Sequence, residues 1–355
     1  MKRYIELIDT FLLNFIKRFL LIYTITLIIM ITAGCATAPR INIEEPTGEY
    51  VWPQQPEIPR IKLLGEWSSK EDFGKPNPLL TFLLGPEGRI KMRRATGVVT
   101  DSKGTIYATD AERAMIFVFD QEGKTLRFLG EGELSAPIGL AIDNTRGILF
   151  VSDSKLDQVL GLDKKSGRVI MTIGGKKDFK NPSGMVYDEE RQRLYVSDTQ
   201  NHVLKVFDKN GNFLMQIGKK GEEDGEFNYP SFLALDRSGR LYVVDSFNFR
   251  IQIFDPDGKF IKKFGRLGDS PGAFARPAGI GVDSDGNIYV IDTAFNNFQI
   301  FNFEGQLLLW VGEGGRKPGQ FALPVGLFID KDDRIYVADT FNYRVQVFQY
   351  LKQKQ

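Results

Sequence analysis

Six aspartates recur at the same place in a repeated string and could together form a ring of carboxylates. They end the strings YATD, FVSD, YVSD, YVVD, YVID and YVAD, at Asp110, Asp153, Asp198, Asp245, Asp292 and Asp339. If the side chains met at a common centre they could bind a divalent cation, because carboxylates are preferred ligands of calcium. An Asp at the start of a turn is also a good acceptor for the backbone N–H groups of that turn. Since every copy carries the Asp, the sequence favours this structural role, and no metal and no cofactor are predicted.

Other catalytic chemistry has few residues to use. The chain of 355 residues contains one Cys, Cys35, and one His, His202. These two side chains cannot build a Cys/His zinc cluster, and the sequence has no C-x-x-C-H string for haem attachment. His202 follows one of the six strings without a nucleophile beside it, so it is predicted to be a solvated turn residue. No catalytic residue is therefore assigned.

The charge balance excludes a class of partner. The chain has 46 Lys and Arg residues against 45 Asp and Glu residues. Binding to nucleic acid needs a surplus of basic side chains that neutralise phosphates. A nucleic-acid partner is therefore not expected.

The amino-terminal segment has the pattern of an export signal. Residues 19–31 are an uninterrupted apolar run, preceded by Lys17 and Arg18. Thirteen apolar residues are too few for a comfortable membrane span, which needs roughly 20. The run is the right length for the core of a signal peptide. The alternative is an uncleaved anchor helix, and both interpretations place the rest of the chain outside the cytoplasm.

The single cysteine follows this signal directly. Thr32-Ala33-Gly34-Cys35 resembles the lipobox of bacterial lipoproteins, with Thr32 where Leu is usual. The resemblance implies removal of residues 1–34 as a signal peptide and lipidation of Cys35, and several acyl chains give stable membrane anchoring. It implies a location in the cell envelope, on the outer membrane or its periplasmic face, or on the outer leaflet of the plasma membrane where no outer membrane exists.

The elements that position the aspartates belong to a repeated unit. The six strings lie 43, 45, 47, 47 and 47 residues apart, a period typical of a repeat architecture. Each copy reads as four short strands joined by tight turns, and Asp-x-x-Gly turns are hairpin signals. We expect an all-β, six-bladed β-propeller of four-stranded antiparallel blades over residues 61–350. The proline-rich residues 35–60 are predicted to be a tether, and residues 351–355 a polar tail.

Closure of the ring can also be read from the sequence. The sixth copy ends at residues 347–350 and lacks a fourth strand. Residues 60–65 match the fourth-strand pattern of residues 259–265. This amino-terminal strand is therefore predicted to complete the last blade and to close the ring.

The repeat resembles that of a known family. Its pattern P-x-G-h-x-h-D-x-x-G-x-h-Y-V-x-D-T-x-N-x-R-h-Q-h-F, where h is apolar, is similar to the NHL repeat of six-bladed β-propellers, here of the bacterial lipoprotein type. Copies four to six match it best. Copies one and two depart from it at residues 111–113 and 154–156, and copy four has Phe232 where Gly is usual.

A candidate binding surface follows from the strand order. The turns after the six strings and the connectors between copies emerge on one face, and in copies four to six they carry aromatic and Arg side chains. The candidate partner-binding residues are Phe247, Phe249, Arg250, Phe295, Phe341, Tyr343 and Arg344. Aromatic and Arg residues dominate protein interfaces. The alternative is that Phe227, Phe274 and Phe321 pack over these turns and bury both sets.

These observations give two functional hypotheses. The first is an exported, lipid-anchored, non-enzymatic scaffold that binds a protein, or a peptide or glycan, in the cell envelope. The second is a hydrolase or lactonase-like propeller that uses a divalent metal in the central channel. Propeller fold alone does not decide between them.

Overall fold

The structure is a computed structural model that describes residues 50–54, 56–74, 90–175 and 177–352. The predicted signal peptide and Cys35 lie outside these residues. The described helices are four short 3-10 turns, η1 (Lys70–Phe73), η2 (Thr199–Asn201), η3 (Ser246–Asn248) and η4 (Thr340–Asn342). None of the helices in the described ranges is long and apolar enough to cross a membrane.

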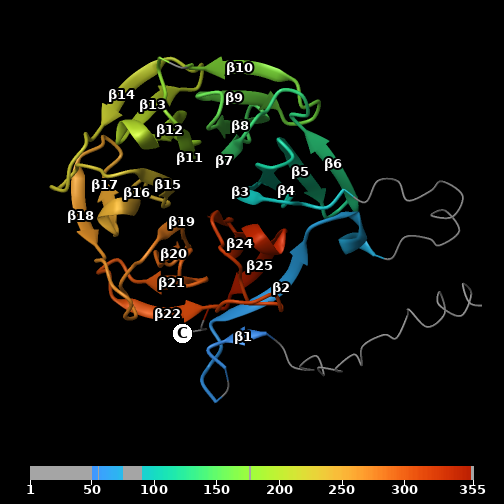
Figure 1. The fold of residues 1–355 in the computed structure, drawn as a ribbon, viewed down its shortest axis with the longest axis vertical. Helices are drawn as coiled ribbons and strands as arrows, with labels where there is room; N and C mark the ends of the chain where they lie inside the picture. Colours follow the sequence, from blue (N-terminus) through green and yellow to red (C-terminus); the bar gives the residue numbers. More distant parts are fainter. Residues whose placement is uncertain (1–49, 55, 75–89, 176, 353–355) are drawn as a thin grey trace, which may run out of the picture. The chain divides into compact units, whose positions relative to one another are not determined.

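Six antiparallel sheets are arranged as the blades of a ring (Figure 1). Blade 1 contains β3 (Ala95–Thr100), β4 (Ile106–Asp110), β5 (Met115–Asp120) and β6 (Thr125–Leu129), and blade 2 contains β7 (Pro137–Asp143), β8 (Ile148–Asp153), β9 (Gln158–Asp163) and β10 (Val169–Ile173). Blade 3 contains β11 (Pro182–Asp188), β12 (Arg193–Asp198), β13 (Val203–Asp208) and β14 (Phe213–Ile217), and blade 4 contains β15 (Pro230–Leu235), β16 (Leu241–Asp245), β17 (Arg250–Phe254) and β18 (Phe260–Phe264). Blade 5 contains β19 (Pro277–Val282), β20 (Ile288–Asp292), β21 (Asn297–Phe301) and β22 (Leu307–Val311). The first strand of each blade lies at the axis and the fourth at the periphery.

Blade 6 joins the two ends of the domain, as predicted. Its strands β23 (Leu327–Ile329), β24 (Arg334–Asp339) and β25 (Arg344–Tyr350) are completed by β2 (Ile61–Trp67), which pairs with β25 from Ile61↔Tyr350 to Trp67↔Val345. A fifth strand, β1 (Val51–Trp52), pairs with the outer side of β2. The predicted tether over residues 35–60 is therefore too long at its carboxyl end, because residues 51–52 belong to this sheet.

The hydrophobic core lies between blades. Each of the six core clusters combines residues of two adjacent blades; Phe117 of blade 1, for example, packs with Tyr336 of blade 6. Five of the six strings carry a fully buried Tyr. In blades 1, 4, 5 and 6 its hydroxyl donates to the Asp that follows the inner strand, as in Tyr242 to Asp236 at 3.0 Å, whereas Tyr195 of blade 3 donates to the Pro256 carbonyl. Burial and the nearby carboxylate raise the pKa of the Tyr242 phenol. A single blade has two apolar faces, so it becomes stable only between neighbours.

Glycine sets how closely two blades approach at the axis. Five inner strands carry Gly at the same position: Gly97, Gly139, Gly184, Gly279 and Gly326. A Cβ atom at any of them would lie only 2.2–2.5 Å from backbone atoms of the next blade. Because backbone cannot rotate away as a side chain can, these positions exclude every larger residue unless the blades separate.

A hydroxyl group also bridges every pair of adjacent blades. In each blade a Ser or Thr beside the string Asp donates to an inner-strand carbonyl of the following blade. The six bonds are Thr109–Ile138, Ser152–Ser183, Thr199–Pro230, Ser246–Pro277, Thr293–Pro324 and Thr340–Ala95. In blades 1 and 2 the hydroxyl precedes the Asp and in the other four it follows it, so the degenerate copies keep the bond from a different position.

The junction between blades 4 and 5 differs from the other five. Phe232 occupies the glycine position of blade 4, and its half-buried side chain lines the axial cavity. The hydroxyl bond of this junction, from Ser246 to the Pro277 carbonyl, is 3.2 Å long, whereas the others span 2.5–2.9 Å. The longer bond agrees with a junction that accommodates a Cβ atom.

The variant Gly139→Ala tests the glycine constraint. Its Cβ would lie 2.3 Å from the Ser183 carbonyl oxygen, so the free energy of unfolding is expected to fall by about 1–3 kcal/mol. Gly65→Ala is the matched control, because a Cβ there has no heavy atom within 4 Å. Urea unfolding of both variants measures the effect, and equal stability of the two would contradict the close approach.

Candidate functional site

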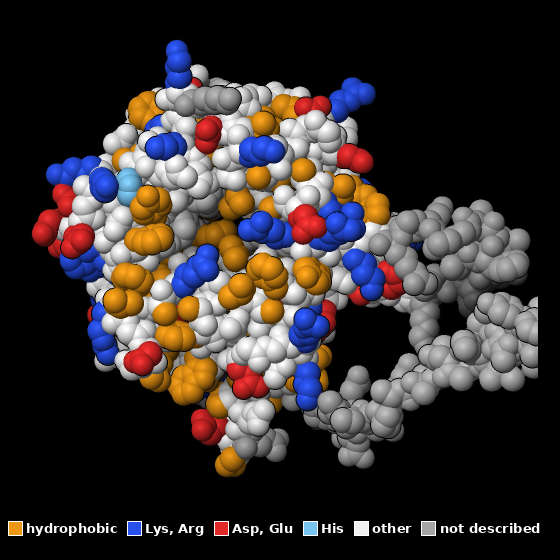
Figure 2. Space-filling view, in the orientation of Figure 1, with side chains coloured by type: hydrophobic (Ala, Val, Ile, Leu, Met, Phe, Trp, Pro, Cys, Tyr) orange, Lys and Arg blue, Asp and Glu red, His pale blue; other side chains and the backbone are white. Residues whose placement is uncertain are grey.

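The two ends of the ring carry different loops. The turns after the second strands and the connectors into the next blade lie at one end, here called the connector face, and the Asp-x-x-Gly turns lie at the other, the turn face. Figure 2, in which the pale-blue histidine is visible, looks onto the connector face. Hydrophobic side chains gather there around a central hollow, with Lys and Arg side chains beside them.

The six string aspartates are buried and bonded within the protein. Each is fully inaccessible to solvent. Asp153 accepts the N–H groups of Ser135 and Ala136 in the preceding connector and of Lys155 and Leu156 in the following turn. The structural role predicted for these carboxylates is confirmed. Among the described residues, no group of three or more His, Cys, Asp or Glu side chains is arranged to hold a metal ion.

Arg250 is a loop clamp and not a surface residue. Its guanidinium is buried and donates to Asp245 at 2.8 Å and to the carbonyls of Glu222, Glu223 and Glu226. Asp245 also accepts from the Asn248 amide at 2.8 Å. Burial raises the pKa of Asp245, while the bonds from backbone N–H, Asn248 and Arg250 favour the charged carboxylate. The network fixes the connector between blades 3 and 4.

Arg344 holds the connector between blades 5 and 6 in the same way. It donates to Asp339 at 2.8 Å and to the carbonyls of Lys317 and Gln320, and it also bonds the Glu66 carboxylate of β2 at 2.7 Å. The prediction that Arg250 and Arg344 are available to a partner is therefore wrong. Arg250 makes four hydrogen bonds and Arg344 five inside the protein, which spacing in the sequence could not reveal.

The predicted aromatic residues divide into covered and uncovered groups. Phe227, Phe274 and Phe321 of the connectors are fully buried, as the packing alternative required. They do not cover the turns completely, since Phe247 remains 61% exposed and Phe341 and Tyr343 each 49%. The two other predicted residues, Phe249 and Phe295, are half-buried.

Sequence reasoning missed the residues at the rim of the central hollow. The last connector residue before each inner strand occupies one equivalent position per blade. In ring order these residues are Arg94, Ala136, Asn181, Tyr229, Arg276 and Leu323. Tyr229 and Leu323 are 37% and 38% exposed, and Arg94 and Arg276 are also exposed. Each of them directly precedes the Pro-x-Gly segment or its equivalent, and this position in the sequence could have identified them as rim residues. We define the aromatic patch as Tyr229, Phe247, Leu323, Phe341 and Tyr343.

His202 connects two blades through its ring. The side chain is 7% exposed, so the prediction of a solvated residue is wrong. Its Nδ1 accepts the Tyr229 N–H at 3.1 Å, and its ring meets Tyr229 edge-on with centroids 4.5 Å apart. Asp157 and Asn296 accept the corresponding N–H groups of Asn181 and Leu323 in other blades. Burial, together with the Lys220 charge, lowers the pKa of His202, which fits an acceptor that must stay neutral.

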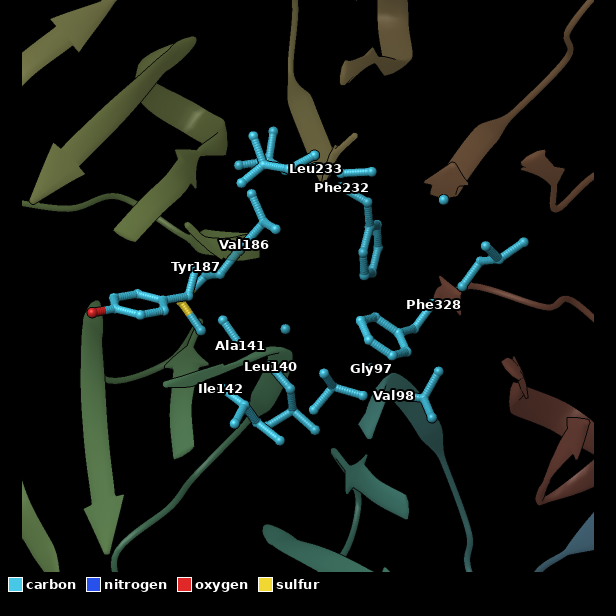
Figure 3. Close-up of a pocket in the computed structure, with 18 of the residues that line it drawn as sticks. Gly97, Val98, Leu140, Ala141, Ile142, Val186, Tyr187, Phe232, Leu233 and Phe328 are labelled. Carbon is cyan, nitrogen blue, oxygen red and sulfur yellow. The ribbon is translucent and has the colours of Figure 1, made fainter. Parts of the chain in front are cut away.

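A cavity of about 200 Å³, lined by apolar side chains together with polar side-chain and backbone atoms, lies on the axis. All six inner strands line it, and Figure 3 shows Phe232 and Phe328 pointing into it from different blades. Asn144 and Glu189, from the turns that follow the inner strands of blades 2 and 3, lie at its turn-face end. Glu189 is the one charged side chain among the described residues that line the cavity.

Comparisons with known proteins agree with this architecture. A family model described as "6-bladed beta-propeller" matches residues 178–240 and 235–305, and an NHL repeat model matches residues 321–348. NHL repeat-containing protein 2 of Bos taurus is 29% identical over 162 residues, which are 34% of this chain and 22% of that protein. The chain thus spans about a fifth of the length of the first curated relatives it matches.

Solved structures share the fold at low sequence identity. A protein of unknown function from Bacteroides thetaiotaomicron has a TM-score of 0.61 at 17% identity, over 82% of this chain and 75% of that one. A streptogramin B lyase has a TM-score of 0.53 at 14% identity, over 75% of this chain and 80% of that one. The chain therefore has a six-bladed propeller fold with an NHL repeat at residues 321–348, and the predicted fold and repeat type are confirmed.

The acceptor role of His202 predicts a pH-dependent stability. Because its folded-state pKa lies below the unfolded value of about 6.5, the unfolded chain takes up the proton first. The stability that neutral His202 contributes is complete above pH of about 6.5 and falls as the pH drops toward the folded-state pKa. Urea unfolding of the wild type and His202→Asn between pH of about 7.5 and 5.5 measures this difference.

The Asn variant is a matched control, because Asn296 makes the same bond and Asn tolerates the positive φ of 59° at this position. It should keep the bond and lose the extra pH dependence. His202→Phe, which imitates Phe249 of blade 4, should lose stability at every pH in this range. Identical pH profiles of wild type and His202→Asn would refute the role.

Proposed function

We propose that this NHL-repeat propeller is an exported, non-enzymatic scaffold that binds a protein partner through its connector face. The proposal rests on one observation, the incomplete burial of the aromatic patch. None of the six core clusters between blades includes Phe247, Phe341 or Tyr343. Exposed aromatic side chains that are grouped on one face are typical of interaction surfaces.

The order of residues around the axis supports a single docking surface. Tyr229, Arg276, Leu323 and Arg94 occupy equivalent rim positions in blades 4, 5, 6 and 1. Arg276 therefore lies between two exposed apolar residues, and a second exposed Arg follows. Aromatic and Arg side chains supply most of the binding energy in protein interfaces. We infer a partner surface that combines apolar side chains with carboxylates.

The loops that carry the patch are held rigidly. Asn248 and Asn342 each donate to a connector carbonyl, at 2.9 and 2.8 Å, in addition to the Arg clamps. Binding to a pre-organised surface loses less conformational entropy than ordering a mobile loop. The predicted interface residues Arg250 and Arg344 thus contribute by holding the surface in place.

The metal-dependent hydrolase receives less support. The repeated carboxylates are occupied by backbone N–H groups and cationic side chains, and Glu189 is the one carboxylate among the described residues that line the axial cavity. Resemblance to a streptogramin B lyase concerns the fold alone, and fold does not determine activity.

The membrane anchor is a separate part of the proposal. It rests on the apolar run of residues 19–31 and on Cys35 after Ala33-Gly34. Lipidation at Cys35 would hold the propeller in the cell envelope, where its partner would also lie. No described residue bears on this part.

The docking surface can be tested by site-specific photo-crosslinking. A benzophenone amino acid placed at position 247 or 341 should capture the same envelope protein, because both positions lie on one surface. The matched controls are positions 213 and 310, where Phe213 and Trp310 are 57% and 52% exposed on outer strands. Different products at 247 and 341, or the same product at the control positions, would contradict a connector-face site.

The strength of the contact follows from the captured partner. With both proteins purified, the double variant Phe247→Ala/Phe341→Ala should bind at least about tenfold more weakly than wild type. Phe213→Ala should bind like the wild type. Unfolding midpoints of both variants exclude a loss of fold.

The anchor is tested by mass spectrometry of the mature protein. The expected species begins at an acylated Cys35 and partitions into detergent. Cys35→Ser should yield a protein without acyl chains that is released from membranes. A wild-type protein that retains residues 1–34 with an unmodified Cys35 would refute lipidation.

A further inference from the structure

The axial cavity has the size and the lining of a site for a small apolar molecule. Its volume of about 200 Å³ exceeds that of an apolar cavity of about 150 Å³ that remains free of water and binds benzene. The lining is aliphatic and aromatic along the inner strands, and polar side chains appear only toward the turn face. The apolar side chains of the lining offer contact area to a hydrocarbon ring, which would displace solvent from them.

Phe232 is the residue that makes this cavity unusual within its own ring. Five blades place Gly at this position, and only blade 4 places a large side chain there. The exception accompanies the longest of the six hydroxyl bonds, at 3.2 Å, so the aromatic ring comes with a less tightly joined junction. Phe232 packs in part against the core cluster between blades 4 and 5, and the remainder of its ring lines the cavity, where it is available for a contact.

Two aromatic rings enter the cavity from different blades. Phe232 comes from blade 4 and Phe328 from blade 6, and both side chains project into the cavity from the same side (Figure 3). Both are half-buried, so solvent reaches part of each ring. Aromatic rings contribute favourable edge-to-face or offset stacking with a third ring beyond simple burial.

The opening of the cavity is polar and negatively charged. Glu189 accepts the Asn144 N–H at 2.5 Å and the Thr145 hydroxyl at 3.1 Å, and these bonds hold its carboxylate beside the entrance. Each carboxylate oxygen retains capacity for a further donor. An anion entering from the turn face would meet this charge in a site of low polarity, whereas a neutral molecule would not.

We propose that the cavity binds one small neutral aromatic molecule of one or two rings, which enters from the turn face and packs against Phe232 and Phe328. This site is independent of the docking surface on the connector face. The propeller then has two binding sites at opposite ends, one for a macromolecule and one for a small molecule.

Titration calorimetry with indole on the full chain tests the proposal. We expect one saturable site with a dissociation constant below about 1 mM. Phe232→Gly, the residue of the other five blades, should weaken binding at least about tenfold because one stacking ring is lost. Val186→Phe, which places a third ring in the cavity, should abolish binding. Indole-3-acetate should bind more weakly than indole because of Glu189.

Two results would overturn the proposal. One is the absence of heat and of any thermal shift with indole up to about 10 mM. The other is binding that Val186→Phe leaves unchanged, because the molecule would then lie elsewhere. Unfolding midpoints show whether each variant is folded, and Leu308→Ala on the outer strand of blade 5 is a control that should bind like the wild type. None of these measurements involves the protein partner, so its absence would not affect them.

Discussion

The close approach of adjacent blades at the axis is the constraint on which the structure depends. Where Gly139 faces the Ser183 carbonyl there is no space for a side chain, and a hydroxyl from Ser152 bonds the same carbonyl. One contact thus fixes both the distance and the orientation of two blades. The junction between blades 1 and 2 has the same contact, and three further junctions place the glycine and the hydroxyl against adjacent residues of the next blade. Between blades 4 and 5 the hydroxyl bond alone is kept. These contacts between a few atoms set the distance between adjacent blades at the axis.

The sequence predicted those parts of the structure that repeat. A regular period with four strands per copy specifies a closed ring, because each copy has two apolar faces to bury. The missing strand of the sixth copy and its substitute near residue 61 followed from the same pattern. What the pattern could not show is which side chains satisfy one another. Arg250 and Arg344 read as exposed cations because the connector carbonyls that bind them are backbone atoms and leave no trace in sequence.

His202 is a second residue whose role the sequence did not show, here because its side chain is buried although a solvated one was predicted. It looked like a neutral variation at a surface turn, since Phe249 and Tyr343 occupy the equivalent position. Its role became visible only beside Asp157 and Asn296, which are chemically unlike it but accept the same kind of N–H. Positions that differ between copies therefore fall into two classes. At some positions different side chains accept the same backbone N–H group. At others, such as Phe232 and the rim residues, the side chain of one blade makes contacts that the other blades do not make.

The split composition of blade 6 has a consequence for when the protein can fold. β2 and β25 lie at opposite ends of the propeller sequence, and Thr340 bonds Ala95 across 245 residues. Blades 1 to 5 can form hairpins as they are synthesised, but the junction between blades 6 and 1 cannot form before residues 344–350 are present. Contacts of such large sequence separation also form slowly. The ring therefore closes only after the last strand of the propeller is available, however early the hairpins of the first five blades form.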